Sequence, residues 1–165
     1  MDAGGVLGSM CFPSFPGFAG RLSAAHPDKA FAADLIRAYN DWHIHEWAGS
    51  YPGRFIPMAL PMIWSAEECA AEVRRVAELG CHSMTFTENP VPLGEPSFHD
   101  EYWNPLWEAL VDCNTVLSIH LGSSGQLVVT APDAPMDVMI QMQPMNISTA
   151  ASDLLWSTVP RRYPD

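Results

Sequence analysis

The chain has 165 residues, and the 48% that are hydrophobic can bury the core of one globular domain. Its 19 acidic and 8 basic side chains give a formal net charge of -11, which argues against binding to nucleic acid or to an anionic membrane surface. No apolar run approaches the roughly 18 residues of a membrane-spanning helix, and residues 1–5 do not resemble a signal peptide. These features predict a cytoplasmic protein with a single domain over residues 1–165.

The four cysteines lie far apart in the sequence. Cys11, Cys69, Cys81 and Cys113 form no C-x-x-C pair of the kind that binds zinc or performs redox chemistry. We therefore predict four free thiols, most of them buried. Disulfide pairing in an oxidising compartment is the alternative.

The first third of the chain predicts a strand, a long loop and a helix. Residues 6–12 have the composition of a buried strand, and the aromatic, proline-rich loop that follows has the composition of a pocket wall. A helix begins near Pro27 and Asp28, which both favour a first turn, and Gly49 ends it.

The predicted helix contains an H-x-H motif, His43-Ile44-His45, of the type that binds metal from a strand. On a helix, residues i and i+2 lie roughly 200° apart and cannot both reach one ion. The helical spacing of Leu35, Tyr39 and Trp42 continues through this point. We therefore interpret the two histidines as surface or boundary residues.

The middle of the chain predicts two strands with a well-marked helix between them. Residues 55–60 form an apolar strand, although Pro57 removes one ladder donor. A capping box at Ser65 and Glu68 and a C-terminal glycine at Gly80 predict a helix over residues 66–79. The next strand is predicted over residues 83–87.

Polar residues follow this strand. Glu88 and Asn89 stand where a parallel barrel places binding residues, and a solvated turn before Pro90 is the alternative. The trio His99-Asp100-Glu101 either binds a metal or caps the next helix, and we favour the cap. That helix is predicted from Asn104, as its N-cap, to residue 114.

The apolar run at residues 115–119 predicts a further strand, which carries His120 at its end and is followed by a loop of small residues. This position makes His120 a candidate metal ligand or base, and a satisfied core histidine is the alternative. Strands and helices alternate up to this point, which is typical of parallel strands in an α/β fold. The segment 136–159 is predicted to be helical and bent at Pro144.

Several short segments, spread over nearly the whole chain, carry a family resemblance through their order and spacing: Tyr51-Pro52-Gly53-Arg54-Phe55-Ile56-Pro57, Leu60-Pro61, Gly80 before a strand, Phe98-His99-Asp100-Glu101 with Trp103 and Trp107, Ser118-Ile119-His120, and Val159-Pro160-Arg161-Arg162-Tyr163-Pro164-Asp165. Together they resemble the amidohydrolase-related family of aminocarboxymuconate-semialdehyde decarboxylase. The resemblance implies a metal-dependent (β/α)8 TIM barrel that decarboxylates, hydrates or hydrolyses small, often aromatic, carboxylic acids.

The resemblance assigns one metal ligand in this chain. His120 matches the histidine at the end of the fifth strand of the family, where it helps to hold a divalent ion, typically zinc. The first-strand H-x-H or E-x-H, the catalytic histidine after the sixth strand and the aspartate of the eighth strand have no match. We therefore expect a partial barrel, with about four parallel strands that correspond to the second to fifth, truncated at both ends.

This interpretation gives roles to the other candidate residues. Polar side chains at predicted strand ends would orient the substrate, a small carboxylic acid, and aromatic side chains would form a wall beside it: Glu88, Asn89, Ser123 and Ser124 in the first group, and Phe12, Phe15 and Trp103 in the second. A full barrel needs about 250 residues, and open sheet edges invite pairing with another chain. The alternative is therefore a non-catalytic half barrel that docks to a partner or forms a homo-oligomer.

Overall fold

The strands of the computed structural model, which describes residues 1–164, are all parallel. β1 (Ser9–Met10) pairs with β2 (Phe55–Ile56), and β3 (Ser83–Thr87) pairs with β4 (Val116–His120). One parallel bridge, between Ala59 and Met84, joins the two pairs. The strand order is therefore β1, β2, β3, β4, which agrees with the predicted α/β fold. Asp165, the last residue of the motif noted above, lies outside the described residues.

Two predicted strands are much shorter than expected. The strand predicted over residues 6–12 keeps two paired residues, and the strand predicted over residues 55–60 ends at Ile56. Pro57 explains the second difference, because it has no N–H to continue the ladder. The chain rejoins the sheet at Ala59, whose N–H and carbonyl bond to Ser83 and Thr85 of β3.

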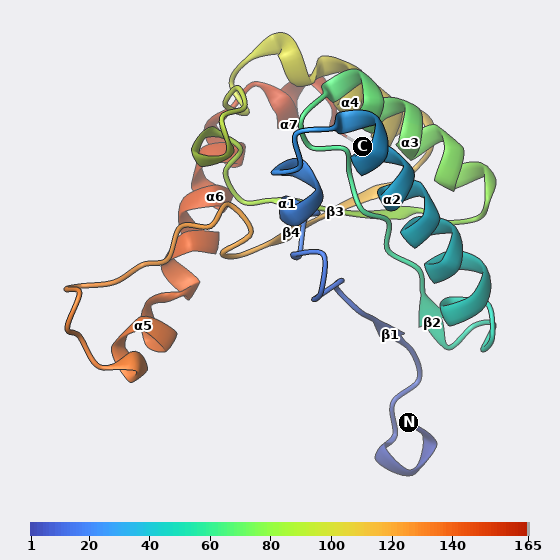
Figure 1. Ribbon diagram of the computed structural model, residues 1–165, viewed down its shortest axis with the longest axis horizontal. Coiled ribbons are helices and arrows are strands. Elements are labelled where there is room, and N and C mark those ends of the chain that lie inside the picture. Colours follow the sequence, from blue (N-terminus) through green and yellow to red (C-terminus); the bar gives the residue numbers. More distant parts are fainter. Residues whose placement is uncertain (165) are drawn as a thin grey trace.

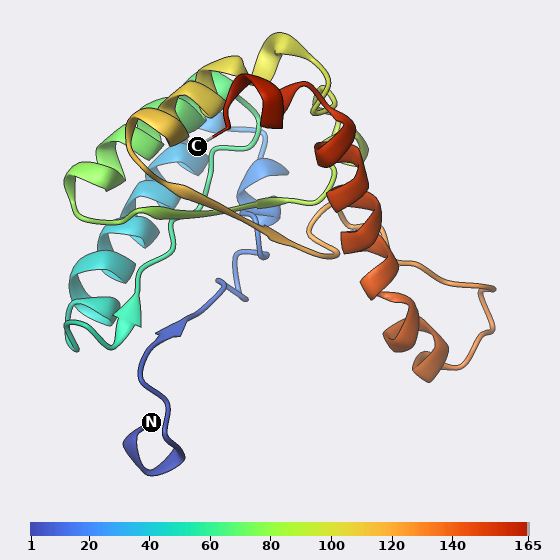
Figure 2. The ribbon, with the colours of Figure 1, turned by 180° about the vertical axis from the view of Figure 1, so that it is seen from behind.

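Three helices lie side by side on one face of the strands: α2 (Lys29–Trp42), α3 (Ala66–Glu78) and α4 (Asn104–Asp112) (Figures 1 and 2). The strand side chains beneath them, Met84 and Phe86, have no exposed surface. The Phe86 ring packs edge-on against Trp103, with 5.4 Å between the ring centroids. The shorter helical elements before the C-terminal region are η1 (Asp2–Gly4), α1 (Arg21–Ala24), the π-helix η2 (His43–Ala48), η3 (Val91–Leu93) and η4 (Glu101–Trp103).

The N-terminus of α3 is capped as predicted, although only half of the capping box forms. The Ser65 hydroxyl accepts the N–H of Glu68 at 3.2 Å. The Glu68 carboxylate does not return to Ser65, because it accepts the indole N–H of Trp64 at 3.2 Å instead. Gly80 follows the helix with φ +84°, a conformation that favours glycine.

The predicted N-cap of α4, Asn104, is wrong. Asn104 has helical backbone angles and is the first residue of α4, which continues directly from η4. Trp103 is the N-cap of α4 and makes no side-chain capping bond. The side-chain cap lies at the start of η4, where the Asp100 carboxylate accepts the N–H of Tyr102 at 2.8 Å. The capping interpretation of the His99-Asp100-Glu101 trio is thus confirmed, and it acts on η4.

The helix predicted to run to Gly49 changes its winding before it ends. Asp28 is the N-cap of α2 and accepts the N–H of Phe31 at 3.0 Å. After Trp42 the chain continues as the π-helix η2, and the N–H of Gly49 bonds to the carbonyl of Ile44. A Cβ atom at Gly49 would clash with the carbonyl oxygen of His45, so this turn requires glycine.

The C-terminal region forms three helices: α5 (Met136–Met142), α6 (Pro144–Trp156) and α7 (Val159–Arg162). The predicted bend at Pro144 is present as the break between α5 and α6. α5 and the loop before it project away from the helices α2 to α4 (Figures 1 and 2). None of the helices within residues 1–164 combines the length and the hydrophobicity needed to cross a membrane.

All four cysteines are free. Cys69 and Cys81 are buried, whereas Cys11 and Cys113 are partly exposed. Burial raises the pKa of the Cys69 and Cys81 thiols, so both are uncharged at neutral pH. The four predicted free thiols are confirmed, although only two of them, rather than most, are buried.

Candidate functional site

His120 is the last residue of β4, and Thr87 is its register partner on β3. Side chains alternate along a strand, so both lie on the face opposite to Phe86, away from the helices. Nδ1 of His120 lies 2.6 Å from the carbonyl oxygen of Leu121. Because a carbonyl oxygen can only accept, Nδ1 carries the proton and Nε2 carries the lone pair. This is the tautomer that binds a metal ion through Nε2.

Two phenyl rings enclose His120. The ring of Phe18 stacks on the imidazole with 3.7 Å between centroids and 8° between planes, and Phe12 approaches edge-on at 4.8 Å. Phe18 is held in turn by β3, since its carbonyl accepts the hydroxyl of Thr85 at 2.5 Å. Sequence reasoning points to Phe12 but misses Phe18, for which the aromatic composition of the loop is the only signal.

Glu88, Ser123 and Ser124 come together just beyond the ends of β3 and β4. The Glu88 carboxylate accepts the hydroxyl of Ser123 at 2.6 Å, and the N–H and hydroxyl of Ser124 at 2.9 and 2.5 Å. All three residues are buried. Because these polar groups form hydrogen bonds with one another, they attach the loop after β4 to the end of β3.

A polar cavity of about 350 Å³ lies at the same edge of the sheet. Its wall includes Glu88, Asn89 and Ser124 from the strand ends and Asn146 and Asp153 from α6. His99 also faces it and pairs with Asp153, with 2.7 Å from Nε2 to the carboxylate oxygen. The structure thus brings Asn89 beside a solvent-accessible polar cavity, separate from the phenyl rings around His120.

Two of the expected wall residues, Trp103 and Phe15, have no ring contact with His120 among the described residues. Trp103 has no exposed surface, and its indole N–H donates to the carbonyl of Pro96 at 2.9 Å. It is a core residue between the strands and the helices, where no substrate reaches it. Phe15 is 92% exposed and lines a groove beside Tyr39 of α2. The aromatic composition of a segment does not distinguish residues of a pocket wall from residues of the core, because aromatic rings are common in both.

The two histidines of the H-x-H motif point in different directions. His43 is 3% exposed and stacks between Tyr39 and Trp47, with centroid distances of 5.7 and 4.8 Å, whereas His45 is exposed. Burial lowers the pKa of His43 and favours its neutral form. The prediction that both histidines are surface or boundary residues is therefore wrong for His43, which is buried, and agrees with the exposed position of His45.

The side chains of this chain that could coordinate a metal ion do not form a complete site. Within residues 1–164, no three histidine, cysteine, aspartate or glutamate side chains are close enough to hold an ion. Catalytic zinc usually has about three protein ligands. Among the described residues, Nε2 of His120 is therefore a single candidate ligand.

The family model described as Amidohydrolase matches residues 1–165. A comparison with curated proteins finds no significant match.

Several solved structures share the fold. The 5-carboxyvanillate decarboxylase of Sphingomonas paucimobilis is 22% identical, with a TM-score of 0.73 over 99% of this chain and 47% of that chain. The 2,6-dihydroxybenzoate decarboxylase of Rhizobium is 18% identical, with a TM-score of 0.73 over 99% of this chain and 51% of that one. The 5-carboxyvanillate decarboxylase of Novosphingobium aromaticivorans, in complex with manganese and 4-hydroxy-3-methoxy-5-nitrobenzoic acid, is 27% identical, with a TM-score of 0.60 over 86% and 36%.

The chain spans about half the length, or less, of these solved structures. Their likeness supports the α/β arrangement of parallel strands, and the family model extends over every residue of the chain. The chain therefore belongs to the amidohydrolase family.

Proposed function

We propose that this chain carries part of the active site of a metal-dependent decarboxylase that acts on a small aromatic carboxylic acid. The observation that carries the proposal is His120, which stands at the end of a parallel strand with its Nε2 lone pair available and its Nδ1 proton bound to Leu121. Support for the reaction class comes from the solved structures that share the fold, since they are decarboxylases and one is in complex with manganese and a nitrobenzoic acid.

In this proposal the four strands correspond to the second to fifth strands of an eight-stranded barrel. The other metal ligands and the catalytic residues then lie on the remaining strands. Because the described residues hold one candidate ligand, we expect the 165-residue chain alone to be inactive.

The residues of this chain have distinct tasks in the complete enzyme. Nε2 of His120 binds the ion, and Phe12 and Phe18 orient the imidazole and keep water from its faces. When bound, a divalent ion polarises the substrate carboxylate and its neighbouring oxygen. Asn89, beside the polar cavity, orients a polar group of the substrate, while Glu88 holds the loop after β4 in place through Ser123 and Ser124.

The metal and the reaction each have an alternative. The family resemblance favours zinc, whereas the Novosphingobium structure is in complex with manganese. The same half-site serves a hydrolase if the ion activates a bound water to attack an ester or amide. The decarboxylases among the solved structures favour carbon–carbon cleavage.

The test replaces His120 by alanine in the complete enzyme and measures bound zinc and manganese by elemental analysis. His45→Ala is the matched control, because His45 is exposed and lies on η2. We expect His120→Ala to weaken metal binding by more than the roughly 10–100-fold that loss of an outer-shell partner costs. Unchanged metal content in His120→Ala would remove the assignment.

A second measurement separates the two reactions. The wild-type enzyme is incubated with 2,6-dihydroxybenzoate and 5-carboxyvanillate, and in parallel with their methyl esters. We expect release of carbon dioxide from the free acids. Cleavage of the esters without release of carbon dioxide would favour the hydrolase instead.

A further inference from the structure

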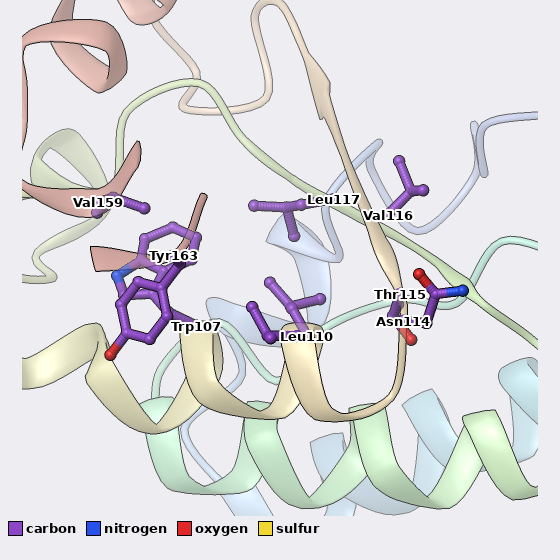
Figure 3. Close-up of a pocket in the computed structure, with 9 residues that line it drawn as sticks. Trp107, Leu110, Asn114, Thr115, Val116, Leu117, Val159 and Tyr163 are labelled. Carbon is purple, nitrogen blue, oxygen red and sulfur yellow. The ribbon is translucent and has the colours of Figure 1, made fainter. Parts of the chain in front are cut away.

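β4, the strand that carries His120, is anchored on the face opposite to the imidazole. Leu117 is the register partner of Met84 and lies on the same, helix-covered face. It is partly buried and packs against the apolar core. Figure 3 shows its side chain directed towards Leu110 of α4, across a groove that both residues line. This packing sets the position of the strand, but it does not decide which ring nitrogen of His120 carries the proton.

The proton of the imidazole is held by one carbonyl group. Nδ1 of His120 donates to the carbonyl oxygen of Leu121 at 2.6 Å. The hydrogen bond at one ring nitrogen of a histidine determines which nitrogen is protonated. If the carbonyl of Leu121 pointed elsewhere, Nδ1 would lose its acceptor and the proton could move to Nε2. The direction of this carbonyl therefore controls the lone pair on Nε2.

Residues 120–123 form a tight turn whose central peptide group contains this carbonyl. The N–H of Ser123 bonds to the carbonyl of His120 at 3.4 Å. Gly122, the third residue, has φ +74°, whereas Leu121 is not among the described residues with a positive φ. This combination is typical of a type II turn. In a type I turn, φ of the third residue is about −90° instead of about +80°, and the central carbonyl points the opposite way.

The backbone angle of residue 122, and not the space around it, requires glycine. A Cβ atom on Gly122 would meet Cδ2 of Leu127 at 3.9 Å, which is an ordinary van der Waals distance. Most L residues, however, strongly disfavour a positive φ. Gly122 therefore permits the turn type that directs the carbonyl of Leu121 at the imidazole.

Glu88 holds this turn from the neighbouring strand. Its buried carboxylate lies 2.6 Å from the hydroxyl of Ser123, and the same hydroxyl lies 2.5 Å from the carbonyl oxygen of His120. The N–H and hydroxyl of Ser124 donate to the carboxylate as well. None of the ion pairs within residues 1–164 includes Glu88. Hydrogen bonds to the loop after β4 therefore account for the position of this buried carboxylate.

We propose that Gly122 and Glu88 are positioning residues that fix the tautomer of His120. The positive φ of Gly122 turns the carbonyl of Leu121 towards Nδ1, and Glu88 locks the turn through Ser123. The proton then stays on Nδ1 and the lone pair on Nε2. The consequence for metal binding rests on the proposed function, whereas the tautomer is a property of the loop and can be measured without metal.

The test determines the tautomer of His120 in this chain, in the absence of metal, from long-range proton–nitrogen NMR correlations of the imidazole. These correlations distinguish a ring nitrogen that carries a proton from one that carries a lone pair. The spectra are recorded well above the ordinary histidine pKa of about 6.5. The signals of His120 are identified by their loss in His120→Ala. The wild-type chain should carry the proton on Nδ1.

Two substitutions at residue 122 separate the backbone angle from the size of the side chain. Valine is β-branched and strongly disfavours a positive φ, whereas asparagine tolerates it. Gly122→Val should therefore move the proton of His120 to Nε2, and Gly122→Asn should keep the wild-type tautomer. Gly94→Val is the control elsewhere in the chain, because Gly94 has φ +89° and open space at the Cβ position. It introduces similar strain outside the His120 turn.

A second pair of variants tests Glu88. Glu88→Leu removes every acceptor for Ser123 and Ser124, so His120 should show a mixture of the two tautomers. Glu88→Gln retains one oxygen for these donors, and its amide can donate to the hydroxyl of Ser124, so the wild-type tautomer should return. Circular dichroism checks that each variant folds. If Gly122→Val does not fold, Glu88→Leu decides the outcome.

A wild-type tautomer in Gly122→Val would overturn the proposal. An equal shift in Gly122→Asn would do so too, because the size of the side chain would then be the cause. In the complete enzyme, Gly122→Val should weaken the binding of zinc or manganese by roughly 10–100-fold, the usual cost of losing an outer-shell partner. The proposed function fails separately: if the tautomer shifts as expected but His120→Ala leaves metal binding unchanged, the lock is present and His120 is not a ligand.

Discussion

The two faces of the β3–β4 pair are held by different interactions. On the helix side, Met84 and Phe86 have no exposed surface. They pack in the apolar core with α3, α4 and the ring of Trp103. On the other side, the hydroxyl of Thr85 bonds to the carbonyl of Phe18, whose ring stacks on His120. Apolar packing is non-directional and contributes most of the stability, whereas a hydrogen bond selects one partner. The helix side should therefore control stability, and the opposite side the position of His120.

The largest expected effect is on the helix side. Phe86→Ala should lower the free energy of unfolding by about 3–5 kcal/mol, because it removes a buried ring and leaves a cavity. Urea denaturation measures the change. Phe86→Leu is the control and should lose less, since it retains more of the volume. If Phe86→Ala were as stable as Phe86→Leu, the helices would have moved to fill the cavity left by the missing ring.

A smaller loss, with a different signature, is expected on the opposite face. Thr85→Val keeps the shape of the side chain but removes the donor to Phe18, and should cost about 1 kcal/mol. It should also shift the ring proton resonances of His120, because the shielding ring of Phe18 moves away. Thr85→Ser retains a hydroxyl and should keep the wild-type spectrum. Unchanged His120 signals in Thr85→Val would break the link between the two residues.

The smallest effect concerns His43, which is buried by aromatic stacking and has an Nε2 without a hydrogen-bond partner among residues 1–164. Burial lowers its pKa below the unfolded value of about 6.5. The unfolded chain then binds the proton more readily, so this contribution to stability is complete above about pH 6.5 and decreases as the pH falls towards the folded pKa.

Unfolding free energies measured between neutral and mildly acidic pH report this dependence. His43→Phe should flatten it, because phenylalanine keeps the stacking and has no titrating group. A variant with the slope of the wild type would assign the pH dependence to other residues.

Sequence patterns predicted the part of the fold that depends on local signals. Ser65 and Gly80 mark the ends of α3 because a cap and a left-handed glycine act within one turn. The order of β3, α4 and β4 follows from short segments of clear periodicity. The lengths of β1 and β2 were overestimated, since pairing depends on a neighbouring strand that the local pattern does not show. The π-helix η2 was missed for a related reason, because its residues have ordinary helical spacing.

The candidate site was predicted only in part. His120 stands out because a polar residue ends an apolar strand. The ring of Phe18 beside it, and the bonds from Ser123 and Ser124 to Glu88, join segments that lie far apart in the chain. The composition of a short segment does not predict contacts between residues that lie far apart in the sequence. Trp103, expected in the aromatic wall beside the substrate, is buried in the core for the same reason.

The π-helix η2 has a consequence for how the sequence can vary. Its last turn brings the carbonyl of His45 to the position that a side chain at residue 49 would occupy. Gly49 has φ −65°, an angle that every residue adopts, so backbone preference does not restrict the position and only the nearby oxygen does. In a library of single substitutions, residue 49 should therefore tolerate nothing but glycine, while its exposed neighbour Ser50 should accept most replacements.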